Sequence, residues 1–228
     1  MAQSSTYPLE YEYLTSRVLQ LIQELVQSRR QLVMTVVARS RPGHNVDVLA
    51  RTLRYEVDRR ASRFTAVQWV PLQFPQLRDR LYANLEYELE TQLSPRPGEM
   101  MQEMLTRIAP LPSEASQRIL WLDWGSFRDA PDDRRRLTHH EMQIWLQFCS
   151  DFLTVHCPRG VRIVSYLAIE ATSNDGLDDF LAGQRQESWC KRPEMRLRTL
   201  LLDPEDDGGP GNTDEPTTGR HSQPAALR

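Results

Sequence analysis

The sequence feature that most constrains this chain is a junction at residues 32–47, where an apolar run breaks at a Pro-Gly turn and passes directly into a helical pattern. Such a pattern predicts a strand, a tight loop and a helix. In nucleotide-binding α/β proteins phosphate binds at this kind of junction, because backbone N–H groups and the helix N-terminus present positive charge there. The junction therefore predicts an α/β fold and makes its loop the first place to look for a site.

The loop lacks the residues that phosphate chemistry requires. The phosphate loop GxxxxGK[ST] combines a glycine cradle with a lysine for the β and γ phosphates and a Ser or Thr for magnesium. Residues 41–46 instead read Arg-Pro-Gly-His-Asn-Val, and the only lysine of the chain, Lys191, lies in Trp-Cys-Lys-Arg-Pro. We therefore expect a scaffold without the phosphoryl-transfer activity and no cofactor.

The rest of the chain alternates predicted strands and helices. Strands are predicted at residues 32–38, 66–72, 118–125 and 161–170, with a short edge strand at 196–202, and helices at 10–27, 46–60, 75–94, 99–108 and 138–155. Strands separated by helices form βαβ units. The predicted fold class is α/β and P-loop NTPase-like, with a mostly parallel sheet of four to five strands and helices on both faces.

Composition places the domain boundary near residue 202. Residues 9–202 carry the strands and helices and are predicted to form one degenerate P-loop NTPase-like α/β domain. Residues 203–228 hold six acids, four prolines and four glycines but no aromatic residue. Such a segment cannot bury enough apolar surface to offset its ordering entropy. It is predicted to be a disordered tail.

Charge, cysteines and hydropathy narrow the classes of function. The formal net charge of −3 does not suggest a nucleic-acid partner. Three cysteines without a CxxC pair suggest neither a disulfide framework nor a zinc module. The chain begins without a signal peptide pattern, and it has no run of about 18 apolar residues. We expect a cytoplasmic protein with no membrane contact.

Asp123 stands at the end of an apolar run, where a Walker B acid would hold the magnesium water. Together with Arg41, Gly43 and Asn45 of the loop it forms the candidate degenerate nucleotide site. However, Trp124 follows it, and no adjacent Glu could polarise an attacking water. A strand-end or loop hydrogen bond is the favoured role of Asp123, and a ligand role is the alternative. No catalytic residue is predicted.

No metal site is predicted. Adjacent helical residues such as His139 and His140 point about 100° apart, whereas metal ligands on a helix need spacings of three or four. Cys149 and His156 are seven residues apart, but their helical face also carries aromatic side chains, which favours core packing. The acids that follow Glu170 are interpreted as a solvated loop and the start of a helix.

The order of features resembles the inactive STAND group, which comprises relatives of the signal-transducing P-loop ATPases that have lost their catalytic motifs. The features are a helix leading into a strand with a broken phosphate loop, two further βα units, a Walker B-type strand Ile-Leu-Trp-Leu-Asp at residues 119–123, and a Trp-bearing helix before the strand at 161–170. The resemblance covers residues 14–170. It implies an adaptor or sensor in bacterial signalling, conflict or defence systems, acting on a separately encoded effector.

A basic segment is the predicted contact surface. Residues 29–63 contain nine arginines and only three acidic residues. This excess of positive charge can serve to bind an anionic partner or can simply form a solvated surface. We expect Arg51, Arg54, Arg59 and Arg60, together with the N-terminal helix, to bind a protein partner. The favoured function is a non-catalytic adaptor or sensor. The alternative is a divergent nucleotide-binding or nuclease-like hydrolytic enzyme, and a homo-oligomer is left open.

Overall fold

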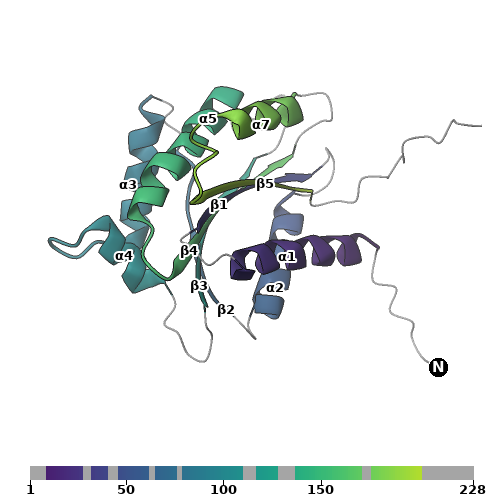
Figure 1. Ribbon diagram of the computed structural model, residues 1–228, viewed down its shortest axis with the longest axis horizontal. Helices are drawn as coiled ribbons and strands as arrows, with labels where there is room; N and C mark the ends of the chain where they lie inside the picture. The colour runs from purple at the N-terminus through teal and green to yellow at the C-terminus, as the bar shows by residue number, and fades with distance from the viewer. Residues whose placement is uncertain are drawn as a thin grey trace, which may run out of the picture.

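The computed structural model describes residues 9–27, 32–40, 46–61, 65–75, 79–109, 117–127, 137–170 and 176–201. Their elements are α1 (Leu9–Gln27), β1 (Leu32–Ser40), α2 (Val46–Ala61), β2 (Thr65–Pro71), α3 (Leu81–Leu93), α4 (Met101–Ile108), β3 (Gln117–Phe127), α5 (His139–Phe148), η1 (Cys149–Leu153), α6 (Thr154–His156), β4 (Val161–Glu170), α7 (Leu177–Gln186) and β5 (Met195–Leu201) (Figure 1). The architecture is α/β with a parallel sheet of five strands, as the sequence predicted.

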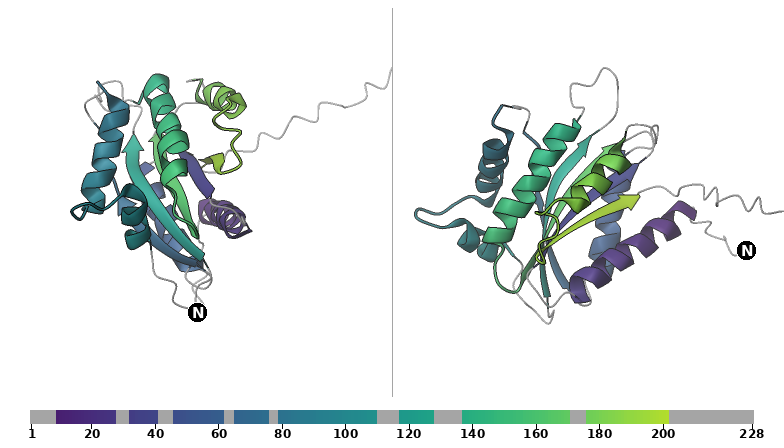
Figure 2. Two further views of the ribbon diagram at one scale, coloured as in Figure 1. Left: turned by 60° about the vertical axis from the view of Figure 1, so that its left-hand side comes forward. Right: turned by 45° about the horizontal axis from the view of Figure 1, so that its top comes forward.

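The five strands form one sheet in the order β2-β3-β4-β1-β5, and every described pair is parallel. Helices α1 and α2 cover one face, and α3, α4, α5 and α7 cover the other (Figures 1 and 2). A parallel sheet covered on both faces needs strands that are apolar throughout. All nine residues of the strand β1 are buried, and six of them are apolar, the exceptions being Thr35, Arg39 and Ser40.

Alternate residues of each strand divide between two cores. In β1, Met34 and Val36 pack in the core under α1 and α2, whereas Val33 and Val37 pack in the core under α3, α5 and α7. The period of two follows from the pleat of the strand. Asp123 therefore shares a face with Trp121, on the α1 and α2 side.

The start of the third helix was predicted wrongly. The sequence placed it at Pro75, but Pro75 is not helical and α3 begins at Leu81. Arg80 precedes it with φ 61°, a left-handed conformation that a right-handed helix cannot contain. Just after β2, the N–H of Leu72 donates to the carbonyl of Asp123 at 2.7 Å, which continues the pairing of β2 with β3 by one residue. The predicted apolar stripe is confirmed in the described helix at Leu81, Leu85 and Leu89, with Leu93 extending it.

The predicted helix at residues 138–155 is present, with one irregularity. Its capping box is confirmed, because the N–H of Glu141 donates to the Thr138 hydroxyl at 3.2 Å and the N–H of Thr138 donates to the Glu141 carboxylate at 2.7 Å. The helix then widens into a π-helical turn, η1. This turn begins at Cys149, whose thiol donates to the Ser165 hydroxyl at 3.1 Å. Burial raises the pKa of Cys149 to about 12, so the predicted core role is confirmed.

The C-terminal part of the domain supplies the edge strand of the sheet. Helix α7 starts in the acidic segment after Glu170, and β5 pairs with β1 as the predicted edge strand. The predicted tail, residues 203–228, lies outside the described residues. Within the described part of the chain, no helix combines the length and the apolar character needed to cross a membrane.

Candidate functional site

Of the four residues predicted for a degenerate nucleotide site, the structure describes one. Arg41, Gly43 and Asn45 lie outside the described residues. Asp123 lies on β3 opposite Tyr166 of β4, immediately before an irregularity in the strand pairing. There Gly125 adopts φ 87°, and its N–H donates to the Asp123 carboxylate at 3.0 Å. Asp123 thus makes the strand-end hydrogen bond that the sequence analysis favoured.

The surroundings of Asp123 disfavour its ionised form. Burial raises the pKa of Asp123, while the Gly125 N–H and the positive charge of Arg54 act in the opposite direction. The Arg54 guanidinium carbon lies 5.1 Å from the centre of the Trp69 ring, a cation–π contact. Arg54 was predicted as a partner-binding residue, but it also contributes to the electrostatics of the candidate site.

Aromatic rings fill the sheet surface beside Asp123. The ring centres of Trp69 and Trp121 are 4.5 Å apart, and those of Trp121 and Tyr166 are 5.8 Å apart. Tyr166 is fully buried, and its pKa is raised well above the usual value by burial and by the negative charge of Asp123. Among the described residues its hydroxyl has no hydrogen-bond partner. These three rings were not part of any sequence-predicted site.

Replacing Tyr166 by phenylalanine tests whether a polar group binds its hydroxyl in solution. Tyr166→Phe is expected to leave the free energy of unfolding unchanged or slightly higher, because removing a buried hydroxyl without a partner removes a desolvation cost. Urea denaturation at pH 7 measures this quantity. A loss of more than about 1 kcal/mol would mean that the hydroxyl is hydrogen-bonded in solution, and that a polar group binds at this position. Tyr87→Phe, at an exposed tyrosine, is the matched control.

The first turn of α2 carries a carboxylate. Val46, the first residue of the helix, is fully buried, and Asp47 follows it. The Ser126 hydroxyl, at the end of β3, donates to the Asp47 carboxylate. A carboxylate at a helix N-terminus complements the positive end of the helix dipole. Asp47 and Asp123 therefore bring two acids to the edge where a P-loop protein would bind phosphate.

The only lysine of the chain lies at the other edge of the sheet. Lys191 is exposed in the turn between α7 and β5. Because β5 runs parallel to β1 and its first residue, Met195, pairs with Val33 near the start of β1, this turn lies at the amino-terminal edge. Asp123 lies toward the carboxyl-terminal edge. Lys191 and Asp123 thus lie toward opposite edges of the sheet.

The predicted contact arginines on α2 differ in their surroundings. Arg51, Arg54 and Arg59 are exposed, while the side chain of Arg60 lies outside the described residues. The Nε of Arg51 donates only to a backbone carbonyl of its own helix, that of Asp47, at 3.2 Å. A nitrogen of Arg59 lies 3.8 Å from the carboxylate of Glu56, whose side chain is 1% exposed. Arg51 is therefore the arginine with the fewest structural ties.

Two exposed apolar residues accompany these arginines. Val48 and Tyr55 are 47% and 57% exposed, and they lie on one helical stripe with Arg51 and Arg59 because the spacing along the chain is three, four and four residues. We refer to Val48, Arg51, Tyr55 and Arg59 as the basic stripe. The sequence analysis missed Val48 and Tyr55, although the spacing was visible in the sequence.

The outer face of α1 is partly engaged inside the domain. The carboxylate of Glu24 accepts two hydrogen bonds from the guanidinium of Arg198 on β5, that from Nε at 2.7 Å. The sequence analysis expected the N-terminal helix to bind a partner, but the carboxylate of Glu24 is already paired with Arg198, and this ion pair joins α1 to the edge strand. Arg17 and Gln20 remain exposed.

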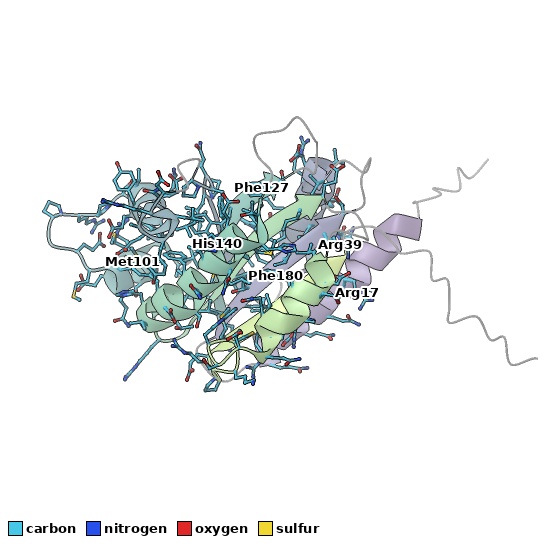
Figure 3. All side chains as sticks on the ribbon, turned by 90° about the horizontal axis from the view of Figure 1, so that it is seen from above. Arg17, Arg39, Met101, Phe127, His140 and Phe180 are labelled. Carbon is cyan, nitrogen blue, oxygen red and sulfur yellow. The ribbon has the colours of Figure 1, made fainter. Side chains whose placement is uncertain are left out.

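Arg39 and His139 both contact helix α7. Arg39, at the end of β1, is buried and forms an ion pair of 2.5 Å with Asp178 of α7, the helix that also carries Phe180 (Figure 3). The ring of His139 stacks on Phe180, with the ring centres 4.6 Å apart. Within the described ranges, no group of three His, Cys, Asp or Glu side chains is placed to hold a metal ion.

Comparisons with known proteins give a limited likeness. No protein-family model matches the chain, and no match was found among curated proteins. Among solved structures the chain is similar to a chain of Drosophila ORC bound to DNA, with 15% identity over 86% of this chain and 30% of that chain and a TM-score of 0.46. It is also similar to the Aeropyrum pernix ORC2 protein in its ADP form, with 14% identity over 82% of this chain and 47% of that chain and a TM-score of 0.40. The chain thus spans about a third to a half of these proteins.

Proposed function

We propose that this chain is a non-catalytic interaction domain on a P-loop-like scaffold. In this proposal it acts as an adaptor or sensor in a bacterial signalling or conflict system, and its effector is a separately encoded protein. The fold retains the sheet and covering helices of the scaffold. In the absence of phosphoryl transfer, the scaffold would serve as a rigid surface for protein contacts.

The observation that supports the non-catalytic half is the carboxylate at the start of α2. A phosphate bound at this helix N-terminus would meet the charge of Asp47, which already accepts a hydrogen bond from Ser126. Like charges a few ångströms apart in a half-buried site repel by several kcal/mol, on the order of the binding energy of a weak ligand. The residue directly after Gly43, where the phosphate-loop pattern needs its lysine, is His44.

The basic stripe supports the second part of the proposal, that the domain binds a protein partner. Arginine and tyrosine are enriched at protein interfaces, because the guanidinium offers a planar fork of donors and the phenol ring a large rigid contact area. Charge reversal within the stripe should therefore weaken capture of a partner without unfolding the domain.

A calorimetric titration tests the first part of the proposal, that the domain does not bind ATP for catalysis. The 228-residue chain titrated with ATP and magnesium is expected to show no heat beyond dilution, which corresponds to a dissociation constant weaker than about 1 mM. Asp47→Asn and Asp123→Ala are titrated in parallel. Micromolar ATP binding by the unmodified chain that is lost in Asp123→Ala would overturn the proposal and support a nucleotide-binding protein.

A further inference from the structure

A second charged surface lies on α3, and its charge is opposite to that of the basic stripe. Helix α3 contains three acids and no basic residue. Tyr87 is 70% exposed and points away from the buried leucines. Glu90, three residues after Tyr87, is its neighbour on the helix surface, and Glu86 lies one turn before Glu90; both glutamates are half-buried. Neither Glu86 nor Glu90 forms an ion pair within the described part of the chain. We refer to Glu86, Tyr87 and Glu90 as the acidic stripe.

The two stripes have the same design with opposite charge. Each has an exposed tyrosine beside charged side chains of one sign. Tyr55 lies one turn from both Arg51 and Arg59, whereas Tyr87 lies to one side of the pair Glu86 and Glu90. An arginine fork matches a carboxylate, and the tyrosine rings add apolar contact area. Each stripe thus has the features that the other stripe would bind.

The two stripes cannot meet within one molecule. Helix α2 lies with α1 on one face of the sheet, whereas α3 lies on the other face with α4 and α5 (Figures 1 and 2). Leu53 and Val57 of α2, and Leu85 and Leu89 of α3, are buried in the two separate cores, so the stripes face away from the sheet. Only a second molecule can bring them together.

We propose that the basic stripe of one copy binds the acidic stripe of a second copy. This inference rests on the proposed function and gives the same surface a second partner besides the effector, namely another copy of the chain. The contact joins two different surfaces, so it is heterologous, and each added copy leaves one stripe of each kind exposed. Because the stripes lie on opposite faces, the expected product is an open head-to-tail assembly, and its stability should fall with salt.

Self-association of the purified chain is the first test. Sedimentation velocity at about 50 mM salt should show oligomers that grow with protein concentration, and about 500 mM salt should return them to monomers, since the Debye length falls from about 14 Å to about 4 Å. A chain that stays monomeric at every concentration at low salt would overturn the inference. That result would leave the proposed function standing, because capture of an effector by the basic stripe is measured separately.

Complementation between two variants identifies the surfaces. One variant carries Arg51→Glu with Tyr55→Ser, which leaves Arg59 beside the buried Glu56. The other carries Glu86→Gln with Glu90→Gln, which removes the negative charges without making a surface complementary to the first variant. Each variant alone is expected to associate at least about a hundredfold more weakly, because the attraction between opposite charges is then lost or reversed. An equimolar mixture should form 1:1 dimers and stop there, because only one intact pair of stripes remains.

Controls separate the proposed contact from misfolding and from general charge effects. Arg159→Glu and Glu187→Arg reverse exposed charges outside both stripes and should self-associate like the unmodified chain. Circular dichroism and the melting temperature confirm that each variant is folded. Two folded stripe variants that remain monomeric when mixed, or that still form long assemblies alone, would contradict the pairing of these two stripes.

Discussion

Trp121→Ala is expected to lower the free energy of unfolding by about 3–5 kcal/mol, a large share of the 5–15 kcal/mol that is typical of a whole domain. Trp121 is completely buried on the central part of the sheet. Its ring contacts Trp69 and Tyr166, with ring centres 4.5 Å and 5.8 Å away. Alanine would leave a cavity between the sheet and α2 that these large rings cannot readily fill.

Two further variants make this prediction specific. Trp121→Phe should cost much less, because phenylalanine keeps most of the ring volume and removes an indole N–H that has no hydrogen-bond partner among the described residues. Tyr55→Ala removes an exposed ring and should change stability by about 0.5 kcal/mol or less. Urea denaturation compares all three. Equal losses for Trp121→Ala and Tyr55→Ala would contradict the packing described for the core under α2.

Local patterns predicted those parts of the fold that depend on neighbouring residues. The mostly apolar sequence of residues 161–170 identified the strand β4, and nine of its ten residues are buried, Arg162 and Ser165 among them. The spacing of Thr138 and Glu141 identified a helix start, because the two groups of a capping box are only three residues apart. In both cases the physical cause lies within one element.

The features that the sequence did not predict depend on distant residues or on unusual backbone. The Glu24 pair with Arg198 joins residues 174 positions apart, and the Asp47 bond with Ser126 joins residues 79 apart. Neither partner has a local signature. The left-handed conformation of Arg80 delays α3, and arginine is not a residue that marks such a position in a sequence. The candidate site at the edge of the sheet is assembled from contacts of this long-range kind.

Charge reversal on the basic stripe should abolish effector capture without unfolding the domain. The surroundings of the arginines decide which substitutions can show this. Arg54 packs over Trp69, and Arg59 lies beside the buried Glu56, so reversing either charge would disturb the fold as well as the surface. Arg51 and Tyr55 are exposed, and within the described part of the chain Arg51 forms only a backbone hydrogen bond in its own helix. Arg51→Glu with Tyr55→Ser is therefore the cleaner test.

The expected loss of capture is large because both main features of an interface are removed together. Truncating an interface aromatic or arginine commonly costs 2 kcal/mol or more, so the double variant should bind at least about thirtyfold more weakly. The measurement is recovery of the effector by the tagged chain from a lysate of its source cells, across a salt series. Arg159→Glu reverses an exposed charge elsewhere and should recover the effector as well as the unmodified chain. Recovery that persists in the folded double variant, or that does not respond to salt, would place the effector contact on another surface of the domain.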